Sequence, residues 1–545
     1  MSVMFKKVNP IVFLVACTIL LYFTRLGAFS LYDAAETTYG EFVKNMLNMG
    51  DWVTLHYNGQ IIFDKPPLYY WFVAILSKLI GFNEFTMRFW AALSGVLTVV
   101  TTYLLGKKFY NEKVGLLSGI IVMTAFQFLV QSRIAELDIV LTLFFTLTLY
   151  LFYMGYSERK SHYYLLSYIP MGLAILLKGV IGFLLPGFTI FLFLLFKKEL
   201  GKLKEMKLLP GLLIVLAIGL PWFLIEYLIH GKVFLDFALG FLFLSRFGGV
   251  VANHTGPWYY YILALLLGFA PWSQFLPLGF WQYIKNWKND PELLSLCFIL
   301  PTLIVFSIAK TKLPSYILPL YPFLAIMVGK LWADLFEGKH KRNMLISNLF
   351  FAVIVGMIFI GTMMIGNMNY SKEYAALMPH LRLLGTILAI GGIFSIILFT
   401  FKKYRLSFAA VPIMVSVITL VLIAYTLPAV EPYKGTKELA QKVNAAIKQT
   451  EQIAVYDIGN RPSVVFYSSK PVVFLESEAE VREFINKKRG YCFVMAGEYA
   501  KLNFTVYTKQ GEIIYFPMFM DKKNPGKFIE KYPAFAKGGE LVVLH

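Results

Sequence analysis

Charged residues are scarce in this chain of 545 residues. Asp, Glu, Lys and Arg make up 15% of it, whereas 58% of the residues are hydrophobic and 17% are aromatic. Soluble domains carry roughly 25% charged residues, so the composition excludes a set of soluble domains and indicates an integral membrane protein. The net charge of +19 is expected to mark cytoplasmic loops, and a nucleic-acid partner is not expected.

Cysteine is scarcer still. The three cysteines, Cys17, Cys297 and Cys492, show neither metal-ligand spacing nor an obvious disulfide pair, which excludes a disulfide scaffold. Motifs of the GxxxxGK[ST], GxGxxG and GxSxG types do not occur in a plausible context. The energy for any reaction is therefore expected to come from the substrate rather than from a nucleotide.

Apolar stretches, by contrast, recur from near residue 10 to residue 428, each long enough to cross about 30 Å of hydrocarbon. Seven basic clusters separate them, beginning at Lys6, Lys107, Arg159, Lys197, Lys285, Lys339 and Lys402. If all seven are cytoplasmic, each interval must cross the membrane an even number of times. In the first interval this requires the short, aromatic segment 66–80 to be an interfacial helix. The thirteen predicted spans are 9–27, 85–106, 114–130, 135–155, 163–177, 180–196, 208–229, 257–280, 292–308, 314–333, 344–366, 381–401 and 406–428.

This threading predicts two domains. Residues 1–429 form a helical membrane domain with a cytoplasmic N-terminus and an uncleaved first span, and residues 430–545 form a small α/β domain on the opposite side. In the second domain we expect helices over 436–449 and 478–488. We expect strands over 453–456, 472–475, 491–495 and 541–544.

Polar side chains gather at the non-cytoplasmic face of this threading. Inserting a charged side chain into the membrane costs at least ~2.5 kcal/mol of free energy, so such residues are expected to face protein or water and to have a functional role. They are Asp33, Glu36, Tyr39, Asp64, Lys65, Asp138, Lys178, Arg246, His254, Lys310 and Lys312, with Tyr316 one turn inside the next span.

Each candidate has a structural alternative. Asp33 and Glu36 lie three residues apart and share a face if the segment is helical; the alternative is an N-cap with a first-turn acid. Lys65, before two prolines, suits a phosphate-binding cation or a snorkelling lysine. Asp138 could equally form a local ion pair with its neighbours, and Lys178 could be a turn lysine.

The remaining cations lie in outer loops. Arg246 can bind a phosphate with two hydrogen bonds or simply stack on an aromatic ring. Lys310 and Lys312 place positive charge on the predicted non-cytoplasmic side, where the positive-inside rule expects little. The outer histidines His56, His230 and His254 lack HxxxH or HxH spacing, so a divalent metal, which the sequence leaves open, would need ligands from separate loops. Cations around acids at this depth suit a lipid-borne phosphate.

Five segments carry a family resemblance. DKPPLYYW (64–71), AELD (135–138), LLKGVIGFLLP (176–186), LSRFGG (244–249) with NHTGPWYYY (253–261), and FSIAKTKLPSYILP (306–319) resemble the bacterial aminoarabinose transferases and their protein O-mannosyltransferase-like GT-C relatives. The resemblance covers roughly residues 10 to 330. It implies a GT-C fold with thirteen transmembrane helices, flat juxtamembrane helices in the first and fourth outer loops, and a periplasmic C-terminal α/β domain.

The same resemblance implies an inverting transferase in the bacterial inner membrane, which takes a sugar from a polyprenyl-phosphate donor and typically adds it to lipid A. By position, Lys65 and Arg246 would hold the donor phosphate, with Tyr39, Lys178 and Tyr316 in the same pocket. Asp33, Glu36 and Asp138 would be the catalytic acids. Asp64, which stands where the family commonly has Glu, would complete the substrate pocket with His254, Lys310 and Lys312.

One departure keeps the substrate open. Where relatives show an adjacent Asp-Glu followed by Thr-Arg-Tyr, this chain has Ala35 at the Asp position and Thr38 at the Arg position. The sugar could be aminoarabinose, a uronic acid, a hexose or a pentose, and the acceptor lipid A, a core sugar or a protein. The alternatives to lipid A glycosylation are a protein O-glycosyltransferase of the same fold and a transporter or flippase of lipid-linked sugars; a transporter predicts polar residues on both faces and paired halves.

Overall fold

The computed structural model describes residues 9–240, 256–365, 377–431, 434–458, 461–487, 489–495 and 541–544. The chain divides into two compact units. The first, here called the membrane unit, comprises Met1–Leu26, Phe63–Met364 and Leu381–Leu422. The second, the sheet unit, comprises Gly27–Ile62, Ile365–His380 and Ile423–His545.

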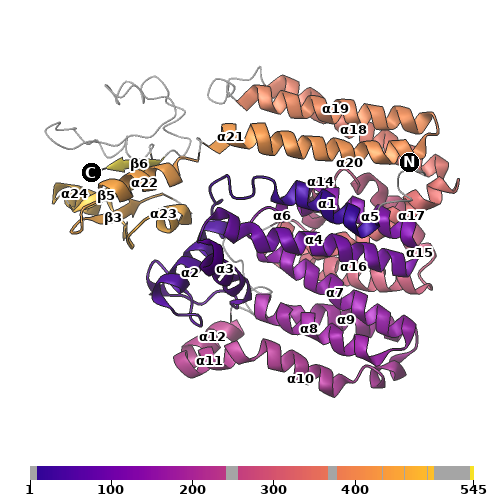
Figure 1. Ribbon diagram of the computed structural model, residues 1–545, viewed down its shortest axis with the longest axis horizontal. Helices are drawn as coiled ribbons and strands as arrows, with labels where there is room; N and C mark the ends of the chain where they lie inside the picture. The colour runs from indigo at the N-terminus through magenta and orange to yellow at the C-terminus, as the bar shows by residue number, and fades with distance from the viewer. Residues whose placement is uncertain are drawn as a thin grey trace. The chain divides into compact units, whose positions relative to one another are not determined.

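Apolar helices that pack side by side build the membrane unit, with α7 lying against both α4 and α8 (Figure 1). The helices up to the middle of the chain are α1 (Pro10–Phe23), α3 (Leu68–Ile80), α4 (Glu84–Phe109), α5 (Glu112–Thr124), α6 (Phe126–Gln131), α7 (Leu137–Glu158), α8 (Ser161–Lys178), α9 (Ile181–Phe196), η1 (Leu200–Lys204), α10 (Leu208–Gly219), α11 (Pro221–His230) and α12 (Lys232–Leu239). Those that follow are α14 (Tyr260–Gly268), η3 (Ser273–Phe275), α15 (Leu276–Lys285), α16 (Asp290–Ile308), η4 (Pro314–Leu320), α17 (Tyr321–Phe336), α18 (Lys341–Ile365), α19 (Met378–Thr400) and α20 (Tyr404–Val421). Helices α18 and α19 extend past the unit's boundary, η7 (Leu422–Thr426) begins at its last residue, and α21 (Leu427–Val430) lies in the sheet unit.

Each predicted span coincides with one helix or with two or three consecutive helices. Within the described ranges, seven helices are long and apolar enough to cross a membrane alone, and up to nine do so if two bent pairs count as one span each. The bends are 47° between α10 and α11, and 120° between α14 and the segment Ser273–Lys285. The chain is thus a multi-pass helical membrane protein, as predicted, whereas the number thirteen stays a prediction.

Segment 66–80 forms the short helix α3, which has 13 residues and begins directly after Pro66 and Pro67. Tyr69, Tyr70 and Val73 are buried on one face. Ile75, Leu79 and Ile80 are apolar and exposed, and a short apolar helix of this kind is compatible with the predicted interfacial position.

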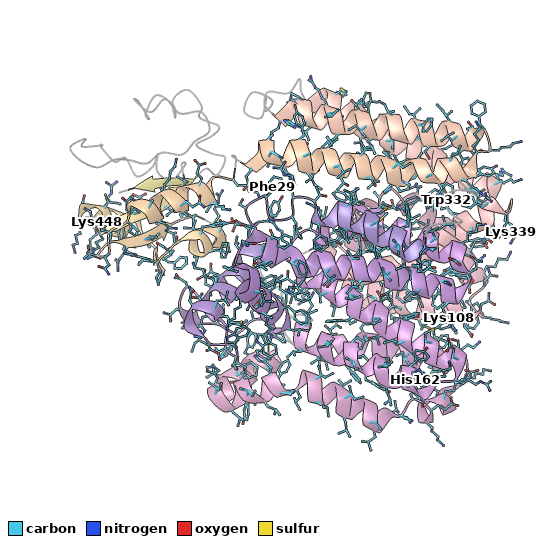
Figure 2. The ribbon with its side chains drawn as sticks, viewed as in Figure 1. Phe29, Lys108, His162, Trp332, Lys339 and Lys448 are labelled. Atoms are coloured by element: carbon cyan, nitrogen blue, oxygen red, sulfur yellow. The ribbon has the colours of Figure 1, made fainter. Side chains whose placement is uncertain are left out.

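Several of the described basic clusters of the membrane unit meet at one end of the bundle. Lys108, His162 and Lys339 lie at that end in Figure 2. Ion pairs join segments that are distant in the sequence: Lys108–Glu158 at 2.9 Å, Lys113–Glu337 at 3.5 Å and Lys197–Asp290 at 2.6 Å. The predicted threading requires this common end, because an even number of membrane crossings between two basic clusters returns the chain to the same side.

The sheet unit has a four-stranded sheet in the order β4-β3-β5-β6. Its strands are β3 (Gln452–Tyr456), β4 (Val472–Leu475), β5 (Gly490–Met495) and β6 (Leu541–Leu544), and its helices include α2 (Ala35–Met49), α22 (Thr436–Ala446), α23 (Pro462–Tyr467) and α24 (Glu478–Asn486). β3 pairs in parallel with β4 and β5, and β6 is antiparallel to β5.

Helices cover both faces of this sheet because successive side chains of a strand point to opposite sides. In β3, Ile453 and Val455 join the apolar cluster with α22 and α23, whereas Ala454 joins the cluster with α24. The predicted α/β fold of the tail is therefore confirmed, with its two helices and four strands within a few residues of the expected bounds. Helix α23, six residues long, was not predicted.

The first predicted outer loop belongs to the sheet unit. Its helix α2 packs on α23, and Gly40 permits the close approach, since a Cβ there would lie 2.7 Å from the Phe466 ring. The hairpin β1 (His56–Tyr57) and β2 (Gln60–Ile61) turns at Asn58-Gly59, and the Asn58 side chain bonds to the backbone of Val472. The domain boundary at 429/430 stays a prediction.

Candidate functional site

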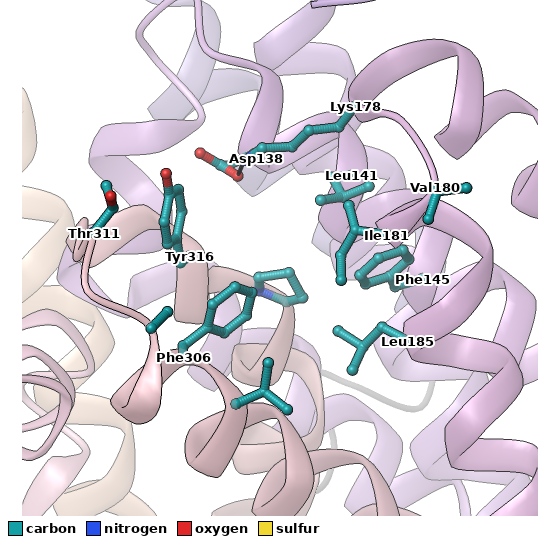
Figure 3. Close-up of a pocket in the computed structure, with 13 residues that line it drawn as sticks. Asp138, Leu141, Phe145, Lys178, Val180, Ile181, Leu185, Phe306, Thr311 and Tyr316 are labelled. Carbon is teal, nitrogen blue, oxygen red and sulfur yellow. Dashed lines mark hydrogen bonds and ion pairs between the residues drawn. The ribbon is translucent and has the colours of Figure 1, made fainter. Parts of the chain in front are cut away.

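A pocket in the membrane unit contains three of the predicted site residues. Its cavity volume is about 100 Å³. Its walls come from α7, the α8–α9 turn, α9, α16 and η4 (Figure 3). The lining residues are Asp138, Leu141, Phe145, Lys178, Val180, Ile181, Leu185, Val305, Phe306, Ala309, Thr311, Tyr316 and Pro319.

An ion pair forms the polar end of this pocket. The Lys178 ammonium donates a hydrogen bond to Oδ1 of Asp138, and it lies 4.9 Å from the centroid of the Tyr316 ring. Asp138 is in the first turn of α7 and Lys178 is in the last turn of α8. Each charge therefore complements the dipole of its own helix.

The pair is largely shielded from water, since each of the two side chains is 9% exposed. Removing two charges from water is costly, and their attraction repays it only with good geometry and further polar contacts. Asp138 thus has a specific partner forty positions away in the sequence. Arg133, one of its neighbours, bonds to the carbonyls of Leu21 and Tyr22 at 2.6 and 2.9 Å.

The rest of the pocket is apolar. Figure 3 shows Phe145, Ile181 and Leu185 on the side away from the Asp138 carboxylate, with Phe306 beside Tyr316. The Phe306 and Tyr316 ring centroids are 5.3 Å apart. A charged end and an apolar body fit an amphiphilic ligand with a polar headgroup better than a soluble ion.

Lys65 and Asp64 lie directly before α3 and form an ion pair with each other. The Lys65 ammonium is 3.1 Å from Oδ2 of Asp64, and each side chain is 19% exposed. Helix α3 packs on α8, the helix that ends with Lys178. The paired Asp64 carboxylate holds the Lys65 ammonium in place.

Lys310 and Lys312 have different environments. Lys310 is exposed, whereas Lys312 is 5% exposed and donates to the carbonyls of Ser307 and Ala309 at 2.8 and 2.6 Å. Lys312 therefore satisfies carbonyls at the end of α16. Thr311, between them, lines the pocket.

The acids of the first loop lie in the sheet unit. Asp33 accepts hydrogen bonds from the Ser463 N–H at 2.8 Å, the Ser463 hydroxyl at 2.6 Å and the Thr37 hydroxyl at 2.9 Å. Glu36 is 2% exposed and accepts from the Tyr32 N–H at 2.8 Å. The N-cap of α2 is Ala34, so Asp33 precedes the helix and ties the loop to α23.

Tyr39 and Glu41 are also among the buried residues of α2. Tyr39 is 8% exposed and packs near Phe42, with ring centroids 6.4 Å apart. Burial raises the pKa of the Glu41 carboxyl, although the nearby Lys44 ammonium opposes this shift. Glu41 also accepts a hydrogen bond from the Asn45 amide at 2.8 Å. Its polar contacts with Lys44 and Asn45 are therefore made within α2.

Arg246 and His254 lie outside the described residues. His230 lies 3.3 Å from Glu226, and His56 lies 3.1 Å from the carbonyl of Thr54. In the part of the chain that the structure describes, no group of three or more His, Cys, Asp or Glu side chains could hold a metal ion.

Two sets of lining residues were not predicted from the sequence. Thr311 joins the pocket of the membrane unit; its place beside two lysines was the available signal. In the sheet unit, Lys434, Lys437 and Arg461 line a second cavity together with Asp33. Their distance from Asp33 in the sequence gave no signal of this proximity.

Comparisons with known proteins agree with the resemblance. Residues 64–225 match the family model described as dolichyl-phosphate-mannose-protein mannosyltransferase. An uncharacterized protein of Aquifex aeolicus is 30% identical over 480 residues, which cover 87% of this chain and 89% of that protein. Undecaprenyl phosphate-alpha-4-amino-4-deoxy-L-arabinose arabinosyl transferase 1 of Pseudomonas fluorescens is 30% identical over 476 residues, which cover 85% and 84%.

A solved structure shares the fold. The crystal structure of ArnT from Cupriavidus metallidurans, bound to undecaprenyl phosphate, superposes with a TM-score of 0.79 at 20% identity. The match covers 98% of this chain and 97% of that one, which confirms the predicted GT-C fold. Taken with the P. fluorescens relative, these findings show that the chain belongs to the family of undecaprenyl phosphate-4-amino-4-deoxy-L-arabinose arabinosyl transferases.

Proposed function

We propose that the protein is an inverting glycosyltransferase that moves a sugar from a polyprenyl-phosphate donor to lipid A or another lipopolysaccharide group. The observation that carries this proposal is the buried Asp138–Lys178 pair at the polar end of an otherwise apolar pocket. The P. fluorescens relative bears undecaprenyl phosphate and 4-amino-4-deoxy-L-arabinose in its name, which supports the same donor class here.

The donor phosphate would bind at the charged end of the pocket. A polyprenyl phosphate carries its anion at the end of an apolar chain, and the pocket has the same polarity. The Lys178 ammonium would neutralise part of the phosphate charge, and Asp138 would hold that ammonium in position. Lys65 and Arg246 are proposed as further phosphate ligands, Tyr316 and Tyr39 as further donor contacts, and Asp64, His254, Lys310 and Lys312 as the remaining substrate contacts.

Catalysis would consist mainly of stabilising the leaving group. The bond between the anomeric carbon and the phosphate oxygen breaks, and the electron pair leaves with the polyprenyl phosphate. Fixed cations near that oxygen stabilise charge that develops in the transition state, and one such group is worth about 10²–10³ in rate. Lys178 is the described residue best placed for this role.

The acceptor oxygen would attack the anomeric carbon from the opposite side. A phosphate dianion of lipid A needs no base, because it carries no proton on the attacking oxygen. A hydroxyl acceptor must lose its proton to a base, and Asp138, Asp33 and Glu36 are the proposed candidates. The acceptor class therefore determines whether a carboxylate must accept a proton.

The proposed location is the bacterial inner membrane, with the pocket and the C-terminal domain on the periplasmic side. The support is the arrangement of charge within the membrane unit. Basic clusters meet at the end of α7 that carries Glu158, whereas the pocket is built around Asp138, in the first turn of the same helix. A cytoplasmic position for the basic end follows from the positive-inside rule.

A reconstituted assay tests the proposal. The purified chain is mixed with undecaprenyl-phosphate sugars and lipid A, and mass spectrometry records the product. Wild-type protein should add one sugar, and Lys178→Ala and Lys65→Ala should lose most of the turnover. Lys197→Gln, at the opposite end of the bundle, is the matched control and should retain it. Donor consumption without a glycosylated acceptor, or full turnover in Lys178→Ala, would refute the proposal.

A donor panel identifies the sugar. Undecaprenyl phosphates that carry 4-amino-4-deoxy-L-arabinose, a uronic acid or a hexose are compared at equal concentration with lipid A as acceptor. Because the relatives are named for an aminopentose, we expect the highest kcat/KM for that donor. A uronic acid or hexose donor that works better would redirect the sugar assignment and leave the transferase mechanism intact.

A further inference from the structure

An aromatic side chain fixes the segment that leads into α3. Three rings, here called the aromatic cluster, have their centroids close to that of Phe63: His230 at 5.2 Å, Phe234 at 5.4 Å and Phe237 at 5.6 Å. They come from the end of α11 and from α12, which are distant from Phe63 in the sequence. The first two contacts are edge-to-face, an arrangement that aromatic pairs favour. Phe63 therefore ties the chain before α3 to α11 and α12.

The aromatic cluster is itself well packed. Phe234 is buried, and its ring meets the buried Trp222 ring of α11 edge-to-face, with centroids 5.6 Å apart. Gly231, with φ of 58°, separates the two helices. A glycine adopts this angle without strain, so α12 can begin directly after α11 and pack on it. The Phe63 ring thus docks on an ordered surface.

A buried carboxylate orients the histidine of the cluster. Nε2 of His230 lies 3.3 Å from Oε2 of Glu226, which is one turn earlier in α11 and is buried. This contact holds the imidazole ring that Phe63 meets. The position of Phe63 is therefore determined by both polar and aromatic contacts of its neighbours.

Little backbone freedom separates Phe63 from the lysine proposed as a phosphate ligand. Asp64 and Lys65 follow directly and form an ion pair at 3.1 Å. Pro66 and Pro67 come next and are buried; each ring fixes its own φ, and the first also restricts the residue before it. Helix α3 then packs on α4 and α8. Because the segment is fixed at both ends, the docked Phe63 ring helps to determine where the Lys65 ammonium lies.

The aromatic cluster is also connected to the pocket of the membrane unit. Phe234 lines an apolar cavity of about 410 Å³ among α8, α10, α11 and α12. Val180, in the α8–α9 turn, lines both this cavity and the pocket that contains Asp138 and Lys178. The surface on which Phe63 docks is thus part of the same wall as the proposed donor site.

We propose that Phe63 is a positioning residue for the lipid donor. By docking on the aromatic cluster, its ring places the Lys65 ammonium for the phosphate group. The proposal rests on the proposed function, because it takes Lys65 as a ligand of a polyprenyl phosphate. The Phe63 side chain has no polar atom, so its effect on the phosphate is exerted through Lys65. Replacing Phe63 should therefore change donor binding only while Lys65 is present.

A double-mutant cycle on the full chain in lipid nanodiscs tests this coupling. Microscale thermophoresis measures the Kd for undecaprenyl phosphate in wild type, Phe63→Ala, Lys65→Ala and the double variant. Lys65→Ala should weaken binding by about tenfold, the loss expected for one charge-assisted contact, and Phe63→Ala by about five- to tenfold, because it misplaces the same contact. The double variant should stay within about twofold of Lys65→Ala, since no further contact is lost.

Two further variants test the aromatic ring. Phe63→Tyr keeps the ring and should bind within about twofold of wild type, whereas the apolar but ringless Phe63→Leu should lie between wild type and Phe63→Ala. The unfolding temperature is recorded beside each Kd, so that recovery of binding by a ring is distinguished from recovery of stability. Where Phe63→Ala does not fold, Phe63→Leu takes its place in the cycle.

Phe336→Ala is the matched control. Phe336 is half-buried like Phe63, and its ring centroid lies 6.1 Å from that of Trp332 and 6.3 Å from that of Phe408. It precedes Glu337, which pairs with Lys113 at the basic end of the bundle. The variant should lose stability as Phe63→Ala does, whereas its Kd should stay within about twofold of wild type because the two sites share no partner.

The outcomes separate this proposal from the proposed function. A loss of affinity in Phe63→Ala that disappears in the Lys65→Ala background supports the positioning role, even if no sugar reaches an acceptor. Losses that multiply in the double variant, an unchanged Kd in Phe63→Ala, or a Phe63→Tyr variant as weak as Phe63→Ala overturn it, even where wild-type protein transfers sugar. An unchanged Kd in Lys65→Ala overturns it and also removes Lys65 from the donor site, and a wild-type protein that does not bind undecaprenyl phosphate overturns both proposals.

Discussion

The two ends of helix α7 carry ion pairs of different kinds. At its end, Glu158 meets Lys108 at 2.9 Å, and these side chains are 26% and 29% exposed. At its start, Asp138 meets Lys178, and both side chains are 9% exposed. The helix has 22 residues, so about 30 Å separates the two pairs at 1.5 Å per residue.

The difference in burial indicates different roles for the two pairs: the pair at Glu158 anchors the helix end, and the pair at Asp138 belongs to the proposed reaction site. Exposed pairs are worth about 0–1 kcal/mol and are screened by salt, so the basic end gains little from any single contact. Burying two charges costs free energy, and removing one partner costs more because the other charge stays buried without a counter-charge. A buried ion pair is therefore more consistent with a functional role than with stabilisation alone. Among the ion pairs described in the membrane unit, Asp138–Lys178 lies buried at the pocket, whereas Lys108–Glu158 and Lys197–Asp290 lie partly exposed at the basic end.

The largest expected effect is that of Lys178→Ala. The substitution removes the pocket cation and leaves the Asp138 carboxylate buried without its partner. Turnover should fall by about 100-fold or more, as for loss of a group that stabilises transition-state charge. Stability should fall by about 3–5 kcal/mol, the usual result of breaking a buried pair. Product formation by mass spectrometry and thermal unfolding measure the two effects, and a change below threefold in turnover would place the chemistry elsewhere.

An intermediate effect is expected for Tyr316. Its ring lies 4.9 Å from the Lys178 ammonium, a contact worth about 2 kcal/mol or less. Tyr316→Ala should lower turnover by at most about thirtyfold, and Tyr316→Phe, which keeps the ring, should stay within about threefold of wild type. Steady-state rates of the two variants give the answer. Equal losses in both would assign the effect to the hydroxyl rather than to the ring.

The smallest effect is expected at the basic end. Lys197→Gln removes an ion pair with Asp290 in which the side chains are 24% and 33% exposed. Stability should change by about 1 kcal/mol or less after solvent screening, and turnover should stay within about twofold. Thermal unfolding and product formation are measured beside Lys178→Ala. A loss of turnover as large as that of Lys178→Ala would contradict the proposed difference in function between the two ends of α7.

The sequence predicted the architecture because its determinants are local. Apolar runs and basic clusters mark spans and their ends, and the strand-like runs of the tail became β3 to β6 within one residue of the expected starts. The same patterns missed α23, whose six residues are too few for a helical period to emerge.

The site was predicted only in part, because partners depend on packing. Asp138 and Lys178 were each chosen from the sequence, but nothing in it indicated that they pair across forty positions. Lys312 was also chosen from the sequence, and no local pattern indicated that its ammonium bonds to carbonyls at the end of α16. Asp33 was chosen as a catalytic acid, and its bonds to Ser463 joined segments that no local pattern connects.

The affinity of a charge-free double variant for undecaprenyl phosphate tests the central claim most directly. Asp138→Leu with Lys178→Met replaces the buried pair with apolar side chains of similar size, an exchange that is often neutral or stabilising. We predict an unfolding temperature close to that of wild type and at least about tenfold weaker binding, the loss expected for one charge-assisted contact. Unchanged affinity in a folded double variant would contradict a phosphate-binding role for this pocket.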